Sequence, residues 1–121
     1  GADLAYIGSP FIATDEANAQ SDYKRMIVES GAMDIVSSSL FTGVSGNYLA
    51  PSIRNAGLDP ENLERGDISA MDFDKAKPKA WSQIWGCGQG IGAVHEVVPA
   101  AKLVERLAGE YAAAKAAVAA M

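Results

Sequence analysis

The stretch GADLAYIGSPFIATDEA, residues 1–17, sets the first expectation for the fold. Its short, largely apolar run over 3–8 predicts a strand, which Gly8-Ser9-Pro10 ends. Thr14 can cap a following helix, and the acidic side chains of Asp15 and Glu16 would stabilise the positive end of that helix. A strand that ends at a glycine and leads into a helix is typical of a βα unit, which needs a partner strand before it. We therefore expect the chain to begin inside a larger α/β arrangement.

Composition excludes several classes of protein. The chain has 121 residues, of which 49% are hydrophobic and 21% charged, as in an ordinary soluble domain. It carries a net charge of −5, so it lacks the basic surface expected of a nucleic-acid binder. No apolar run approaches the roughly 20 residues that span a bilayer, so we expect no membrane insertion and a cytoplasmic location. The lone Cys87 excludes an intrachain disulfide and a cysteine-built metal site, and we expect no metal.

Glycine and proline divide the rest of the chain into short elements. Pro51 fits the first turn of a helix that Gly57 ends, and Asp59-Pro60 repeats that start signal. The polar residues over 66–80 predict a loop. The C-terminal segment has the clearest periodicity, with Leu103, Leu107, Tyr111, Ala114 and Val118 on one face. In all, we expect a mostly helical chain with helices over about 22–30, 51–56 and 99–118, and short strands near 3–8, 33–38 and 90–94.

Two glycine-containing segments are candidates for ligand binding. A strand that ends at Gly8-Ser9 can offer backbone N–H groups and a hydroxyl to an anion, although the local pattern alone favours a simple turn. The cluster over 86–92 has four glycines but does not have the spacing or flanks of a dinucleotide-binding loop. Close packing of backbone is the favoured interpretation there, with Gln89 available as a polar pocket contact.

Catalytic side chains do not assemble into a recognisable motif. His95 could serve as a general base, but a histidine between an apolar run and a proline-started helix is more commonly a surface residue. Ser37-Ser38-Ser39 lacks the strand-turn-helix context of a hydrolase nucleophile. Cys87 has no neighbouring cation in the sequence to lower its pKa. We therefore assign no catalytic residue.

Three stretches nevertheless resemble a known enzyme family. They are GADLAYIGSPFIAT, DIVSSSLFTGVSGNYLAPSIRNAGLDP and WGCGQGIGAVHEVVPAAKLVERL, which follow one another over nearly the whole chain. Together they closely resemble the C-terminal part of nitronate monooxygenases, formerly called 2-nitropropane dioxygenases. The resemblance implies an FMN-dependent (β/α)8 barrel that oxidises alkyl nitronates with dioxygen. Residues 1–121 would then be a single segment, the last barrel strand with a C-terminal helical extension, whose upstream barrel is missing.

The resemblance also assigns residues to the cofactor. Gly8 and Ser9 match the position where family members hold the FMN phosphate through backbone amides, and Ser9 keeps the hydroxyl of the threonine common there. Pro10 departs from the family and removes one potential amide donor. The family's catalytic histidine belongs to an earlier strand, and His95 does not match it. A barrel needs about 250 residues, so we expect this chain to be a fragment that is inactive by itself.

An alternative function follows from the same chain without the resemblance. The segment could be a helical protein-interaction module that performs no catalysis. In either case exposed apolar surface would favour association of copies into a homo-oligomer.

Overall fold

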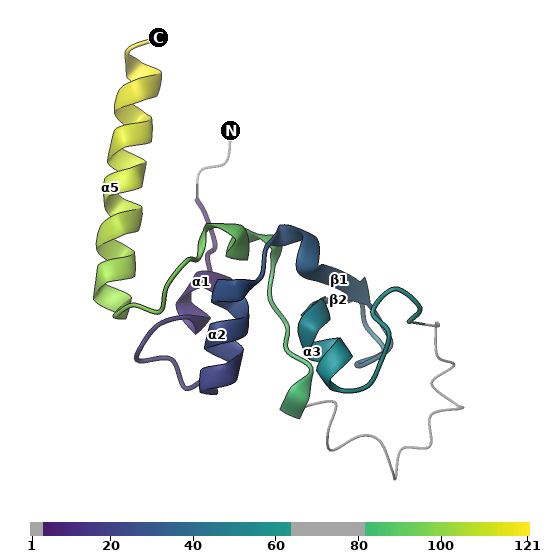
Figure 1. Cartoon of the computed structure of the whole chain (residues 1–121). Coiled ribbons are helices and arrows are strands. Elements are labelled where there is room, and N and C mark those ends of the chain that lie inside the picture. The colour runs from purple at the N-terminus through teal and green to yellow at the C-terminus, as the bar shows by residue number, and fades with distance from the viewer. Residues whose placement is uncertain (1–3, 64–81) are drawn as a thin grey trace.

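A two-stranded antiparallel sheet and the short helices around it form the body of the molecule, from which a long C-terminal helix extends (Figure 1). The computed structural model describes residues 4–63 and 82–121. In chain order its elements are the helices α1 (Ser9–Ile12) and α2 (Ser21–Glu29), the 3-10 turn η1 (Ala32–Asp34), the strands β1 (Ile35–Ser38) and β2 (Gly46–Leu49), the helix α3 (Ala50–Asn55), the 3-10 turn η2 (Gln89–Ala93) and the helix α5 (Ala100–Ala119). The fold is a small mixture of helices and sheet, and the described residues do not form a barrel.

The hairpin of β1 and β2 organises the body. Ile35 pairs with Leu49 and Ser38 with Gly46, so the strands are antiparallel and in register. A third segment, 85–87, lies along the other edge of β2, where the Leu49 N–H donates to Trp85 O at 2.8 Å and the Cys87 N–H to Asn47 O at 3.2 Å. The strand predicted near 33–38 is therefore confirmed over β1. β2 lies where the sequence predicts no strand.

Two predicted helices in the first half of the chain are confirmed. α2 begins at Ser21 and ends at Glu29, close to the predicted 22–30. α3 has Pro51 in its first turn and ends before Gly57, whose φ of +83° is the left-handed conformation that glycine adopts without strain. The helix start signal at Asp59-Pro60 gives only a turn within the residues described up to 63. In this turn the Asp59 carboxylate accepts hydrogen bonds from the Glu61 N–H and the Asn62 side chain. The loop predicted over 66–80 lies outside the described residues.

Two predicted strands are wrong. Residues 4–8 have no regular structure, and Leu4 and Tyr6 are 92% and 104% exposed, because no strand among the described residues pairs with them. The stretch near 90–94 forms the turn η2, whose glycines allow the backbone to curl instead of extend. Thr14 is likewise not a helix cap, since its hydroxyl donates back to Phe11 O at 2.8 Å.

The core lies where α1, α2, β2 and η2 meet. Its buried side chains are Ala13, Ile27, Leu49, Cys87, Ile91 and Val94, with Ile12, Tyr23, Met26, Val28, Ile35 and Trp85 packed around them. Tyr23 and Trp85 stack with their ring centres 4.9 Å apart, and the Tyr23 hydroxyl donates to Gly86 O. These contacts fix the segment 85–87 between α2 and the sheet.

Among the residues that the structure describes, the C-terminal helix contacts the body only at its base. α5 spans Ala100–Ala119, which confirms the helix predicted over 99–118. Just before α5, Val98 O accepts a hydrogen bond of 3.0 Å from the Asp15 N–H. At the first residue of α5, the Ala100 N–H donates to the Glu16 carboxylate at 2.8 Å. Leu103 is buried, whereas all residues from 108 to 121 are exposed, and the helix stands clear of the body in Figure 1. The predicted apolar face therefore meets the body through its first turns alone.

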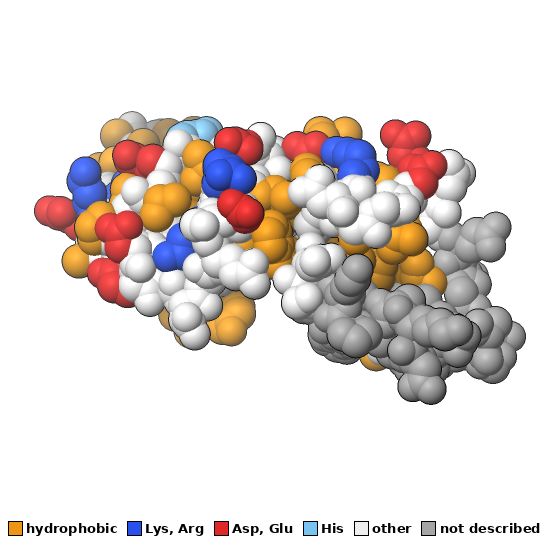
Figure 2. All heavy atoms as spheres, turned by 60° about the horizontal axis from the view of Figure 1, so that its bottom comes forward, with side chains coloured by type: hydrophobic (Ala, Val, Ile, Leu, Met, Phe, Trp, Pro, Cys, Tyr) orange, Lys and Arg blue, Asp and Glu red, His pale blue; other side chains and the backbone are white. Residues whose placement is uncertain are grey.

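Within the described ranges, no helix combines the length and the apolar character needed to cross a membrane. Figure 2 shows acidic and basic side chains interspersed over one face, with hydrophobic side chains reaching the surface between them.

Candidate functional site

The two glycine segments singled out in the sequence meet at one junction. Ser9 opens α1, and its hydroxyl oxygen accepts a hydrogen bond of 2.8 Å from the Gly88 N–H. Gly88 is the residue before η2, so the starts of a short helix and of a 3-10 turn lie side by side although 79 positions separate them in the chain. The sequence singled out both segments, but nothing in it pairs them.

The surroundings of Gly8 are open. A Cβ atom built on Gly8 would have no other atom within 4 Å, and φ is −120°, which any residue can adopt. The packing of the chain therefore does not require glycine at this position. Ser9 follows as the first residue of α1, Pro10 contributes no N–H, and the Phe11 N–H donates to Gly8 O at 3.0 Å.

The rest of the glycine cluster has a structural role at one position. Gly86 lies against β2, where an added Cβ would come within 3.1 Å of Asn47 O, so a side chain would displace the segment from the sheet edge. Gln89 is the first residue of η2 and is exposed, directly after the Gly88 N–H that Ser9 holds. It therefore lies beside the junction.

Burial controls the ionisation of the two groups next to this junction. Cys87 is buried in the core, and loss of solvent raises the pKa of its thiol to about 11. The same cause, with the nearby Cys87, raises the pKa of the Tyr23 phenol to about 12. Both groups are therefore neutral near pH 7, and the Cys87 thiol is a poor nucleophile.

The other nucleophiles and bases do not join the junction. His95 is exposed in the segment after η2. Ser37 and Ser38 belong to β1, where the Ser38 hydroxyl accepts from the Leu40 N–H at 3.1 Å. Among the residues that the structure describes, no group of three His, Cys, Asp or Glu side chains is placed to hold a metal ion.

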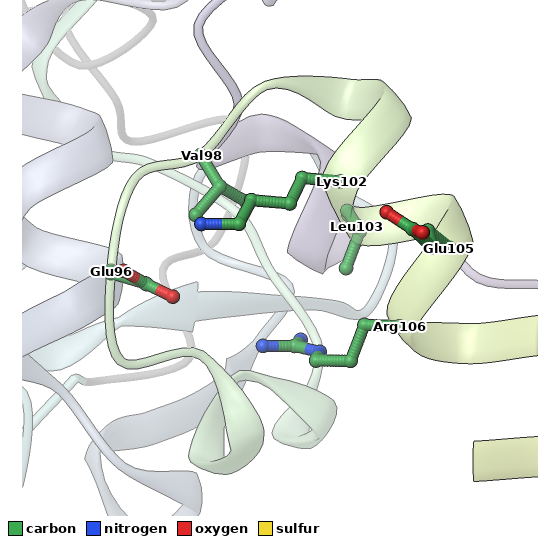
Figure 3. A pocket seen from close by; sticks show the side chains of 6 residues that line it. All are labelled: Glu96, Val98, Lys102, Leu103, Glu105 and Arg106. Carbon is green, nitrogen blue, oxygen red and sulfur yellow. The ribbon is translucent and has the colours of Figure 1, made fainter. Parts of the chain in front are cut away.

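A separate cavity of about 330 Å³ lies at the base of α5 (Figure 3). Lys102 and Arg106, one helical turn apart, extend over it from α5, and Glu96 faces it from the preceding loop. Val98, Leu103 and Glu105 complete its lining. In the sequence Lys102 and Arg106 belong to the polar side of the helix. The cavity forms because the loop before Pro99, with Glu96 and Val98, lies opposite that side.

A comparison of the chain with protein-family models, with curated proteins and with solved structures finds no match.

Proposed function

We propose that this chain forms part of an FMN-dependent oxidoreductase similar to the nitronate monooxygenases, in which Gly8 and Ser9 hold the flavin phosphate. The observation that carries the proposal is the hydrogen bond that the Ser9 hydroxyl accepts from the Gly88 N–H. This bond holds the Ser9 side chain beside the start of η2. The proposal includes the finer fold, the C-terminal portion of a (β/α)8 barrel, and a cytoplasmic location.

The donors at the junction fit a phosphate. The Ser9 oxygen accepts from Gly88, which leaves its own proton free to donate to an anion. In the first turn of α1 the Phe11 N–H donates to Gly8 O at 3.0 Å, which leaves the N–H groups of Gly8 and Ser9 for an anion. The open space at Gly8 lets an anion approach the backbone. Pro10 limits this donor set to Gly8, Ser9 and the exposed Gln89 side chain.

The exposed segment before the junction supports the barrel part of the proposal. Leu4, Tyr6 and Ile7 are exposed apolar residues in a stretch that has no partner strand among the described residues. Pairing with neighbouring parallel strands would satisfy their backbone groups and cover their side chains.

The proposed chemistry divides between the cofactor and the chain. When bound, FMN supplies the redox chemistry by which an alkyl nitronate is oxidised with dioxygen. Gly8 and Ser9 orient the cofactor through its phosphate, and Gln89 contacts the ligand at the edge of the site. We assign no catalytic residue to this chain, because His95 is exposed on another segment.

The test compares FMN with riboflavin, which lacks the phosphate, by quenching of flavin fluorescence on titration with the 121-residue chain. We expect FMN to bind at least about tenfold more tightly than riboflavin, as one hydrogen bond to a charged group contributes about 1.5–3 kcal/mol. Equal affinities, or no binding of FMN, would overturn the proposal.

Two variants locate the binding on the junction. Gly8→Val should weaken FMN binding at least about tenfold without unfolding the chain, since the position is open and its φ is negative. Ser9→Thr keeps the hydroxyl and is the matched control, which should retain FMN. If Gly8→Val binds FMN as the wild type does, the phosphate is held elsewhere.

The second candidate function is a protein-interaction module, and the exposed length of α5 favours it. Val104, Tyr111 and Val118 are 53%, 72% and 72% exposed, on a helix that leaves the body after its first turns. Exposed apolar side chains along one element are typical of a surface that another protein covers.

A further inference from the structure

The exposed residues of α5 follow a heptad repeat. In a heptad written abcdefg, Val104, Tyr111 and Val118 occupy successive a positions, and Leu107 and Ala114 occupy the d positions between them. This spacing of three and four residues is that of a seam between two helices in a coiled coil. Leu107 is half-buried and the other four are exposed, so the seam is free along the part of α5 that stands clear of the body (Figure 1).

The residue types at the seam favour two parallel strands. Valine at a with leucine at d, as in Val104 and Leu107, is the combination that favours parallel dimers. The small Ala114 lies next to the large Tyr111 in the repeat, which lets two helices approach closely around an aromatic side chain.

The charges beside the seam point to the same arrangement. Glu110 occupies a g position and Lys115 the following e position, and in a parallel pair these two positions of opposite helices face each other. Both side chains are exposed, and Lys115 forms no ion pair with any residue that the structure describes. Glu110 contacts Arg106 at 3.5 Å within its own helix and has a second carboxylate oxygen for a partner. A parallel dimer would thus form two Glu110–Lys115 pairs related by symmetry.

We propose that α5 pairs with the α5 helix of a second copy of this chain as a parallel two-stranded coiled coil. The proposal rests on the second candidate function, the interaction module, and names its partner. It does not involve the flavin site at Gly8 and Ser9. The seam is short, so the dimer should be in equilibrium with the monomer and form as the protein concentration rises.

Sedimentation equilibrium of the full 121-residue chain tests the dimer. We expect the average mass to rise from 12.6 kDa toward twice that value with concentration. Tyr111→Glu, which places a charge in the seam at an exposed position, should raise the dissociation constant at least about 30-fold. Ala116→Glu adds the same charge at an f position on the opposite side of the helix and should leave the dissociation constant unchanged. A monomer at every concentration, or a dimer that Tyr111→Glu does not weaken, would overturn the proposal.

Cysteine cross-linking tests the orientation. Val118→Cys should form a disulfide-linked dimer on mild oxidation, while the wild type should not, because its Cys87 is buried. A mixture of Val104→Cys and Val118→Cys should yield disulfides only between identical variants. Preferential formation of the mixed disulfide would show antiparallel helices and contradict the proposal. A failure of either test leaves the FMN titration unaffected, because that experiment measures phosphate recognition and not mass.

Discussion

Two serine hydroxyls connect segments that are far apart in the chain. Ser9 accepts from the Gly88 N–H, and the fully buried Ser52 donates to Leu49 O at 2.7 Å and accepts from the Trp85 N–H at 3.0 Å. Each hydroxyl satisfies a backbone group of the segment between residue 85 and η2. Because a buried polar group without a partner is destabilising, these bonds hold that segment on the body.

Replacing Ser52 should destabilise the fold. In Ser52→Ala the Trp85 N–H loses its acceptor and Leu49 O loses its donor, a side chain that is 0% exposed, which should lower the free energy of unfolding by about 1–3 kcal/mol. Urea denaturation followed by circular dichroism measures the change. Ser45→Ala, at an exposed position in the loop before β2, is the control and should stay within about 0.5 kcal/mol of the wild type. Equal losses of unfolding free energy in the two variants would show that the hydrogen bonds of Ser52 do not stabilise the fold.

The thiol of Cys87 should react slowly while the chain is folded. With a pKa of about 11, only about one thiol in a thousand is ionised at pH 8, and the side chain is buried as well. Modification by an aromatic disulfide reagent at pH 8 should therefore be at least about 100-fold slower in the folded chain than in urea. Similar rates in the two states would mean that Cys87 is accessible and its thiol unperturbed.

At the scale of elements, the junction of α5 with the body decides where the long helix points. The backbone of residues 13–15 pairs with Val98, and Glu16 accepts from the Ala100 N–H at the first turn of α5. A carboxylate at a helix N-terminus both accepts a hydrogen bond and offsets the helix dipole. That contact joins the start of the chain to its last helix.

The attachment of α5 should weaken in acid. The hydrogen bond from Ala100 is the largest of the effects that lower the pKa of Glu16 below its ordinary 4.5. A lowered pKa in the folded state means that the stabilisation is present above pH 4.5 and is lost as the pH falls through the folded value. Thermal unfolding between pH 7 and pH 3 should show a steeper acid loss in the wild type than in Glu16→Gln. Glu29→Gln, on the exposed end of α2, is the control and should follow the wild type. Parallel curves for Glu16→Gln and the wild type would contradict a role for this carboxylate.

At the scale of the whole molecule, two of the exposed apolar surfaces among the described residues bear on the proposals. One is the stretch with Leu4, Tyr6 and Ile7, and the other is the seam of α5. The first is the surface that the flavin proposal covers with further strands, and the second is the surface that the dimer proposal covers with another copy. The two proposals therefore use different parts of the chain and can be tested separately.

The chain by itself should not oxidise nitronates. Gly8 and Ser9 would contact only the phosphate of FMN, and without further contacts the reactive ring would lack the fixed position that accelerates the reaction. An oxygen-consumption assay with added FMN and an alkyl nitronate should give no turnover above that of free FMN. The control is a nitronate monooxygenase assayed under the same conditions. Comparable turnover by the 121-residue chain would contradict the proposal that this chain holds only the phosphate of FMN.

Local signals in the sequence determined α2, α3, α5 and β1. Pro51 with Gly57 defined α3, the periodicity from Leu103 onward defined α5, and the apolar run ending at Ser38 defined β1, because start signals, stop signals and spacing act over a few residues. Only the tertiary structure decided the absence of a strand over 4–8, the presence of β2 and the junction of Ser9 with Gly88. Residues 4–8 failed to form a strand because pairing depends on a neighbour, whereas β2 formed because β1 and the segment 85–87 flank it. The contact of Ser9 with Gly88 spans 79 positions, and no local pattern encodes a hydrogen bond that the packing of the core creates.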